Sequence, residues 1–192
     1  MTDTLPLVPS IARTALVLID LQMFTVEHPM RPRSGREILA NAMRLADACR
    51  AAGMLVVLVR AGGGAIRLTP PVDAGYPPMN FPANAHDFPA ELGPKDGDVV
   101  VTKYNLGAFY CTDLDAQLRR RGIDTILLGG MTTAFGVEGT ARQAHERAYA
   151  QIFVSDAIAG FTDAEHDSAM QIVLPRLGRV RTTDELITAI SG

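Results

Sequence analysis

Short runs of consecutive apolar residues alternate along the chain with longer segments in which apolar residues recur every three or four positions. Short continuous runs are typical of strands buried on both faces of a sheet, and the longer period is typical of helices. The runs predict strands at residues 15–19, 54–59, 99–102, 126–128 and 151–154, with a shorter one at residues 179–181. The periodic segments predict helices at residues 35–52, 113–121, 135–148, 163–174 and 184–190.

Capping residues support these boundaries. Ser34 and Glu37 have the spacing of a capping box, and Gly53 follows the same helix as a stop. Thr162 is a candidate cap for the helix at residues 163–174. Because strands and helices alternate, we predict a doubly wound α/β fold, in which a parallel sheet lies between two layers of helices.

Residues 61–94 interrupt the alternation, because they contain Gly62–Gly64, many prolines and little periodicity. A loop of this length in a compact domain is usually a lid, a binding segment or an oligomer contact. No internal repeat and no linker divides the chain, so we expect one domain over residues 1–192.

The composition narrows the class of protein. The chain has 192 residues, is 47% hydrophobic and carries a net charge of −3, which gives no reason to expect nucleic acid as a partner. Its two cysteines, Cys49 and Cys111, are too few for a disulfide framework. Neither an export signal nor a membrane-spanning run is visible, so we expect a cytoplasmic protein with no membrane association.

Ionisable residues follow two of the predicted strands. Asp20 ends the first strand, Lys103 ends the third, and the fourth leads through a turn of small residues into a helix. In an open parallel sheet the carboxyl ends of the strands share one edge, where ligands bind. A lone aspartate here is more often a cap and a lone lysine more often solvated, but together they predict a reaction centre.

Several residues near these strand ends are candidates for substrate contacts, namely Gln22, Phe24, Arg60, Tyr104, Phe109, Thr132 and Thr133. Each has a structural alternative. Arg60 can hold a substrate carboxylate or form an ion pair within the protein. The aromatic side chains can line the cleft or belong to the core, and the threonines can bind ligand or satisfy the turn.

The histidines do not show the spacing of metal ligands. His28, His86, His145 and His166 are scattered in polar or loop contexts, so we expect no metal site and no cofactor.

Four segments, LVLIDLQ, VVVTKYNLGAFYCTDL, GMTTAFGVEGTARQA and VSDAIAGF, resemble the isochorismatase-like hydrolases, also called the cysteine hydrolase family. The resemblance runs from about residue 14 to residue 190. It implies a Rossmann-like, six-stranded parallel sheet in the order 3-2-1-4-5-6 and a cleft that holds Asp20 and Lys103. It also implies a cis peptide between Met131 and Thr132, beside the substrate, and assembly into a dimer or tetramer.

One position departs from most of that family. Most members carry a nucleophilic cysteine six residues before the arginine of a Thr-Ala-Arg motif, and here that position is Gly136. A thioester at this position is therefore excluded. The zinc-binding Asp-x-His pattern of nicotinamidases is also absent after the second strand. The resemblance extends to isochorismatases, which carry the same glycine and cleave a vinyl ether with an acid and water. Their aromatic and histidine residues are missing from this turn, so the substrate stays open.

The leading hypothesis is a small-molecule hydrolase without a cysteine nucleophile. Asp20 would carry a proton, Lys103 would orient it, and Gly136 would leave room for substrate or water. Burial raises the pKa of Asp20 and Lys103 lowers it, so its role as acid or base stays open. The rivals are a non-catalytic small-molecule-binding protein and an amidase that uses Cys111, although we favour a small packed thiol near a helix start as the interpretation of Cys111.

Overall fold

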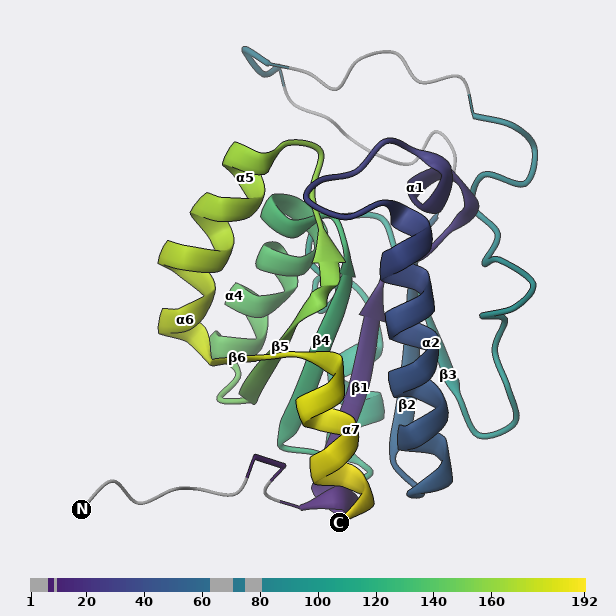
Figure 1. Cartoon of the computed structure of the whole chain (residues 1–192), viewed down its shortest axis with the longest axis vertical. Helices are drawn as coiled ribbons and strands as arrows, with labels where there is room; N and C mark the ends of the chain where they lie inside the picture. Colours follow the sequence, from purple (N-terminus) through teal and green to yellow (C-terminus); the bar gives the residue numbers. More distant parts are fainter. Residues whose placement is uncertain (1–6, 9, 63–70, 75–80) are drawn as a thin grey trace.

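The computed structural model describes residues 7–8, 10–62, 71–74 and 81–192 (Figure 1). Its centre is a six-stranded sheet in the order β3-β2-β1-β4-β5-β6, and every pair of neighbouring strands is parallel. The predicted fold class and strand order are confirmed. Residues 63–70 and 75–80 of the long irregular segment, for which we expected a lid, a binding segment or an oligomer contact, lie outside the described residues, as do residues 1–6 and 9.

The strands are β1 (Thr14–Ile19), β2 (Leu55–Ala61), β3 (Val99–Lys103), β4 (Thr125–Met131), β5 (Ala150–Ala159) and β6 (Arg179–Arg181). The helices are α1 (Met23–Glu27), α2 (Gly35–Ala51), α3 (Leu114–Arg119), α4 (Glu138–Glu146), α5 (Asp163–Ser168), α6 (Leu174–Leu177) and α7 (Thr183–Ser191). The described residues also form three single turns: η1 (Ile11–Arg13), η2 (Thr133–Val137) and η3 (Ala169–Val173), of which the last two are π-helical.

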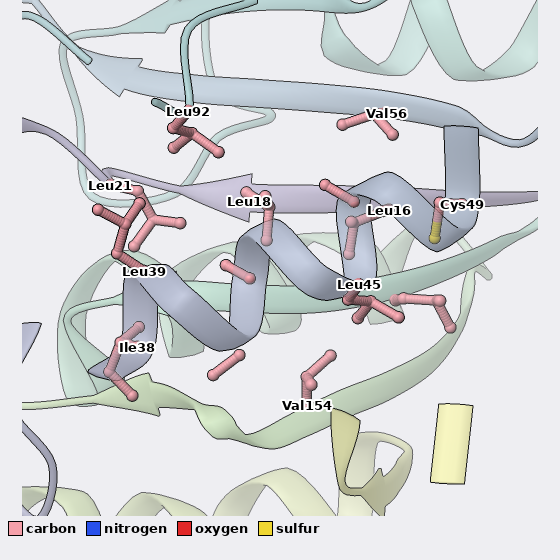
Figure 2. Packing of buried hydrophobic residues seen from close by; sticks show 14 of the residues in the cluster. Leu16, Leu18, Leu21, Ile38, Leu39, Leu45, Cys49, Val56, Leu92 and Val154 are labelled. Atoms are coloured by element: carbon pink, nitrogen blue, oxygen red, sulfur yellow. The ribbon is translucent and has the colours of Figure 1, made fainter. Parts of the chain in front are cut away.

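Strand β1 lies at the centre of the sheet, and all its side chains are buried. Leu16 and Leu18 pack into a cluster with α2 and α7, whereas Val17 and Ile19 pack into a cluster with α3, α4 and α6. Figure 2 shows the first cluster, where α2 crosses β1. Each large aliphatic side chain buried in this way contributes about 1.5–3 kcal/mol to folding. The alternation of side chains along β1 therefore holds both helical layers onto the sheet.

The capping signals in the sequence are borne out. The Ser34 hydroxyl accepts a hydrogen bond from the Glu37 amide, and the Glu37 carboxylate accepts one from the Ser34 amide. Thr162 caps α5 through the same kind of box. Within the described residues, no helix combines the length and apolarity needed to cross a bilayer.

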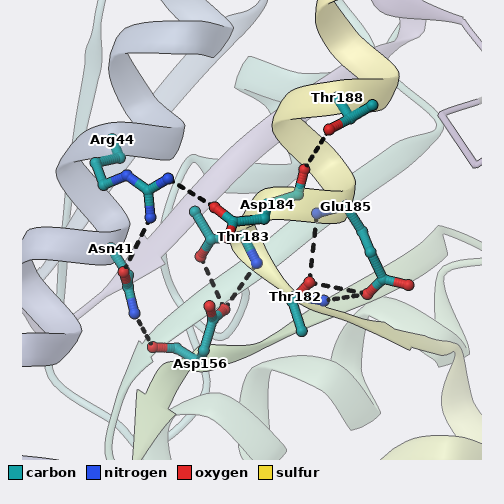
Figure 3. Close-up of polar contacts among 8 residues, drawn as sticks. All are labelled: Asn41, Arg44, Asp156, Thr182, Thr183, Asp184, Glu185 and Thr188. Carbon is teal, nitrogen blue, oxygen red and sulfur yellow. Dashed lines mark hydrogen bonds and ion pairs between the residues drawn. The ribbon is translucent and has the colours of Figure 1, made fainter.

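Strand β5 is longer than the sequence pattern predicts. Ser155 and Asp156 break its apolar run, yet the strand continues past a register shift opposite β4 to Ala159. Asp156 tolerates this place because its carboxylate accepts hydrogen bonds from the amide and hydroxyl of Thr183, both at 2.8 Å. The Asp156 carbonyl also accepts one from Asn41 of α2 (Figure 3). These polar contacts join α2, β5 and α7.

The carboxyl ends of the strands form the upper edge of the sheet in Figure 1, below α1. At this edge Gly130 lies so close to β1 that a Cβ atom would come within 2.1 Å of the Ile19 carbonyl oxygen. Its φ of +116° is a conformation that glycine adopts readily. The glycine therefore lets the end of β4 and turn η2 approach the end of β1.

Candidate active site

The strand ends bring Asp20 and Lys103 together. Lys103 Nζ lies 2.7 Å from Asp20 Oδ2, and the two residues are only 4% and 7% exposed. Lys103 Nζ also donates a hydrogen bond to the Asn105 carbonyl at 3.2 Å, so its position is determined by two acceptors. A charged pair inside the fold is uncommon unless its groups are paired in this way.

The backbone directs the Asp20 side chain into the site. Asp20 has a φ of +50°, a left-handed conformation that is uncommon for residues other than glycine and often occurs at functional sites. Its amide donates to the Val59 carbonyl at 2.9 Å, and its carbonyl accepts from the Thr25 hydroxyl. Both backbone groups are therefore satisfied in a conformation that the local sequence alone would not favour.

The Asp20 carboxyl has one paired and one unpaired oxygen. Oδ2 contacts Lys103, whereas Oδ1 is buried and has no hydrogen-bond partner. Burial raises the pKa of Asp20 above the 3.8 of an ordinary aspartate, and the nearby Lys103 ammonium offsets only part of this rise. Of the two opposing effects on this pKa that the sequence left open, burial is the larger one.

Gly136 lies in turn η2, directly beside the carboxyl group of Asp20. A Cβ atom on Gly136 would come within 3.1 Å of Asp20 Oδ2 and within 3.0 Å of both Ile19 Cγ2 and the Met131 carbonyl oxygen. Such contacts are tighter than side chains normally make, so a larger residue would displace its neighbours. The missing side chain thus leaves the face of Asp20 open.

A cavity of about 310 Å³ opens at this point. Of the residues predicted from the sequence, those that line it are Asp20, Phe24, Lys103, Tyr104, Met131, Thr132 and Gly136. The peptide between Met131 and Thr132 is cis, as the resemblance implied. The rest of the wall mixes the aromatic rings of Phe81, Phe135 and Phe161 with smaller apolar and polar residues.

Gln22 does not line the cavity, in contrast to our expectation. It is fully buried and bridges two parts of the backbone. Its side-chain amide donates to the carbonyls of Ala61 and His86 at 3.1 and 2.7 Å, and its carbonyl accepts from the Ala61 amide at 2.8 Å. Gln22 therefore holds the end of β2 against the segment that contains His86.

Arg60 and Phe109 also lie outside the cavity lining. Arg60 Nε donates to the Thr102 hydroxyl at 3.0 Å, so its guanidinium joins β2 to β3 instead of facing the cavity. Phe109 is buried in the core against Tyr149, with ring centres 5.5 Å apart. Phe109 therefore takes the core position that we left open as its structural alternative, whereas Arg60 bonds to a hydroxyl and not to the acidic partner that its alternative named.

Thr133 is the remaining candidate that does not reach the cavity. It is fully buried, and its hydroxyl lies 2.9 Å from Nδ1 of His166 on α5. Burial lowers the pKa of His166, which favours the neutral imidazole in this contact. Thr133 therefore ties turn η2 to α5, while its neighbour Thr132 faces the cavity.

Other residues line the cavity that sequence reasoning missed, namely Thr25, Ala61, Gly62, Phe81, His86, Asn105, Leu106, Phe135 and Phe161. Phe135 and Phe161 stood within the motifs that suggested the family, so their aromatic character was an available signal. Phe81 and His86 come from the long irregular segment, where no periodicity indicates which side chains point inward.

The cysteines lie away from the cavity lining. Cys111 is exposed and free, so it is neither a packed thiol nor a residue of the cavity wall. Cys49 is buried in α2, and burial raises the pKa of its thiol to about 12. In the described part of the chain, no group of three or more histidine, cysteine or acidic side chains is arranged to hold a metal ion.

Comparison with known proteins gives an independent view of this arrangement. A family described as the isochorismatase domain matches residues 14–185. The isochorismatase family protein YwoC of Bacillus subtilis is 44% identical over 182 residues, which cover 93% of this chain and 94% of YwoC. The isochorismatase family protein YecD of Escherichia coli O157:H7 is 42% identical over 180 residues, with coverage of 92% and 96%. A solved isochorismatase family protein from Burkholderia thailandensis has a TM-score of 0.88 at 40% identity, with coverage of 94% and 97%.

Proposed function

This chain belongs to the isochorismatase family, whose members are hydrolases, and on that premise we propose that it cleaves a small molecule by proton transfer and water, without a cysteine nucleophile. Asp20 is the proton donor, Lys103 is its partner, and Gly136 leaves space for the reacting group. The single observation that carries this proposal is the buried Asp20 carboxyl, which has a raised pKa and belongs to a residue that lines the cavity.

The bond that suits this site best is an enol (vinyl) ether. The protonated carboxyl of Asp20 gives its proton to the terminal carbon of the double bond, and positive charge develops on the ether carbon. Water adds to that carbon and returns a proton to the Asp20 carboxylate. The resulting hemiketal breaks its bond to the ether oxygen and releases an alcohol and a carbonyl compound. One water is consumed, and Asp20 ends in its starting state.

Lys103 stabilises Asp20 after Asp20 has given up its proton and become a carboxylate. After proton transfer the carboxylate lies 2.7 Å from the Lys103 ammonium, in a site with little solvent. The same contact that costs little when Asp20 is neutral becomes strongly favourable when Asp20 is negative. Lys103 therefore stabilises the step in which the acid loses its proton.

Named relatives differ in the bond that they cleave. The isochorismatase of Bacillus subtilis is 29% identical over 96% of this chain and 60% of its own length. The ureidoacrylate amidohydrolase RutB of Variovorax paradoxus is 30% identical over 80% of this chain and 69% of its own length. The glycine at position 136 favours chemistry of the first kind, because it supplies no thiol. The exposed position of Cys111 gives no support to the amidase alternative.

We also propose the setting in which the protein works. The two free cysteines are consistent with the cytoplasm, and we propose that the domain acts there as a dimer or tetramer, without a cofactor. Size-exclusion chromatography with light scattering measures the assembly directly.

The experiment that tests this function compares Asp20→Asn with wild type on isochorismate, simple enol ethers, small amides and ureides. Asparagine has nearly the same shape but cannot donate a carboxyl proton. We expect the rate on the best substrate to fall by at least about 100-fold. The exposed Asp96 supplies a matched control, and Asp96→Asn is expected to keep the wild-type rate. Retained turnover in Asp20→Asn would refute the assignment.

A further inference from the structure

Turn η2 and the residue before it supply three residues of the cavity wall, Thr132, Phe135 and Gly136. The turn is π-helical, a rare conformation that is often found at functional sites. Within it, the amides of Phe135 and Val137 both donate to the Thr132 carbonyl, at 3.2 and 3.1 Å. A single helical turn is not stable by itself, so the position of η2 depends on its contacts with other elements.

One contact holds the end of the turn that contains Gly136. The fully buried Thr140 of α4 donates from its hydroxyl to the Gly136 carbonyl at 2.7 Å. The same hydroxyl accepts a hydrogen bond from the Ala108 amide at 3.0 Å. This end of the turn is therefore fixed by the helix that follows it and by the segment that follows Lys103.

A second contact holds the opposite end of the turn, and it comes from a distant part of the chain. Thr133 is fully buried, and its hydroxyl lies 2.9 Å from Nδ1 of His166 on α5, a residue that is only 6% exposed. Gly160 leaves the space in which the two side chains meet, because a Cβ atom there would come within 3.2 Å of Thr133 Oγ1. Among the described residues, no other group forms a hydrogen bond with this hydroxyl. The start of the turn therefore depends on His166.

The part of the turn that depends on His166 includes the cavity wall. Thr132 directly precedes Thr133 and lines the cavity. The ring centre of Phe135 lies 6.2 Å from that of Phe161, and both rings belong to residues of the same wall. A shift of Thr133 away from α5 would therefore change the shape of the cavity. His166 is not among the lining residues, so it affects the wall only through Thr133.

We propose that His166 is a positioning residue for substrate binding, whose bond to Thr133 holds Thr132 and Phe135 in the places where they contact the substrate. The acid Asp20 does not depend on this bond, since its own bonds go to β2 and β3. Loss of the bond therefore weakens substrate binding and leaves the chemical step nearly unchanged. This inference rests on the proposed function, because it concerns how the substrate of that reaction is held.

The first test needs no substrate and measures hydrogen exchange at the amides of Phe135 and Val137, which reports local opening of the turn. Thr133→Val replaces the hydroxyl with a methyl group and leaves His166 Nδ1 without its partner. We expect these amides to exchange about 10-fold faster than in wild type, as for the loss of one buried hydrogen bond. Thr133→Ser keeps the hydroxyl and should stay within about threefold of wild type.

Thr183→Val is the matched control for these variants. Thr183 is also fully buried, and its hydroxyl donates to Asp156 at 2.8 Å, away from turn η2 (Figure 3). The same substitution there removes a comparable bond, so the amides of the turn should exchange as they do in wild type.

Kinetics then measure the effect on the substrate, with whichever of isochorismate and the simple enol ethers the wild type cleaves fastest. Thr133→Val and His166→Leu are each expected to raise KM about 10-fold and to change kcat by less than about threefold. The double variant should have the KM of either single variant, because both changes remove the same bond. His166→Asn should recover most of the loss, because its side chain places a polar atom near the position of Nδ1. KM does not depend on the fraction of protein that is folded, so a purely structural role would leave it unchanged.

The inference is overturned if the turn amides exchange as slowly in Thr133→Val as in wild type. It is also overturned if the effects of Thr133→Val and His166→Leu on KM multiply in the double variant. Asp20→Asn separates these outcomes from failure of the proposed reaction. Loss of turnover in Asp20→Asn with a wild-type KM in Thr133→Val sinks only the positioning inference. Full turnover in Asp20→Asn with a raised KM in Thr133→Val sinks only the catalytic assignment.

Discussion

Two acid–base pairs lie within the fold at opposite ends of the sheet, and they differ in how completely the acid is bonded. At the carboxyl end, Lys103 contacts Asp20 at 2.7 Å. At the amino end, Arg50 of α2 contacts Asp98, just before β3, also at 2.7 Å, and the Asp98 side chain is only 2% exposed. Distance and burial alone do not tell these pairs apart.

The two ion pairs differ in how many hydrogen bonds the oxygens of each carboxylate accept. Arg50 donates from Nε to Asp98 Oδ1 and from Nη2 to Oδ2, and the Lys95 amide adds a third bond to Oδ2. Asp20 Oδ2 contacts Lys103 and the Ala61 backbone also lowers the pKa of this carboxyl, but Oδ1 has no hydrogen-bond partner of normal geometry. The first carboxylate has hydrogen bonds at both oxygens and joins α2 to the segment before β3. The second is less completely bonded, and burial raises its pKa, a combination that is typical of functional carboxyl groups.

The largest expected difference between the pairs follows from removing each cation. Lys103→Met takes away the charge that stabilises ionised Asp20, so we expect the rate to fall by at least about 100-fold. Arg50→Met leaves the Asp98 carboxylate without its partner and should lower the free energy of unfolding by about 3 kcal/mol. Its rate per folded molecule should match wild type. Urea unfolding and initial rates, measured on the same samples, separate these effects.

The comparison would fail if both variants lost stability and activity to the same degree. In that case the pair at Asp20 would be a structural ion pair like the one at Asp98, and the cavity would be incidental.

A smaller effect is expected from closing the space beside Asp20. Gly136→Ala places a Cβ about 3.1 Å from Asp20 Oδ2, so the carboxyl or turn η2 must move. We expect the free energy of unfolding to fall by about 1–3 kcal/mol and the rate of substrate cleavage to be lower than in wild type. Gly93→Ala is the control, because a Cβ there meets only the Ala90 carbonyl oxygen, at an ordinary 3.5 Å. Equal rates for the two variants would show that the open face of Asp20 is not used.

Patterns along the chain predicted the sheet well because β1 is buried on both faces and reads as one continuous apolar run. Asp20 and Lys103 were found for a related reason, since each directly follows such a run and parallel strands end at a shared edge. The capping box of Ser34 and Glu37 is local, because only two residues separate its two members. The sequence alone was therefore enough to predict it.

The residues that sequence reasoning misassigned depend on contacts between distant segments. Gln22 next to Asp20 was expected to face the substrate, but its partners are Ala61 and His86, which local sequence cannot reveal. His86 was considered only as a metal ligand, because no period exists in its loop to indicate that its ring points inward. The extension of β5 through Asp156 was hidden because Thr183, which satisfies that carboxylate, lies far along the chain.

The protonation of Asp20 is the central claim, and it has a direct consequence for the pH dependence. A raised pKa means that the folded protein holds the proton to higher pH than the unfolded chain, so Asp20 stabilises the fold below its unfolded pKa. That contribution is lost as pH rises through the folded pKa. If Asp20 is the acid, kcat/KM should also decline tenfold per pH unit above the same midpoint.

The most direct measurement is the ¹³C titration of the Asp20 side-chain carboxyl, assigned by its absence from the spectrum of Asp20→Asn. We predict a midpoint above the 3.8 of an unperturbed aspartate. A midpoint below that value would mean that Lys103 keeps Asp20 ionised, and it would contradict the assignment of Asp20 as the proton donor.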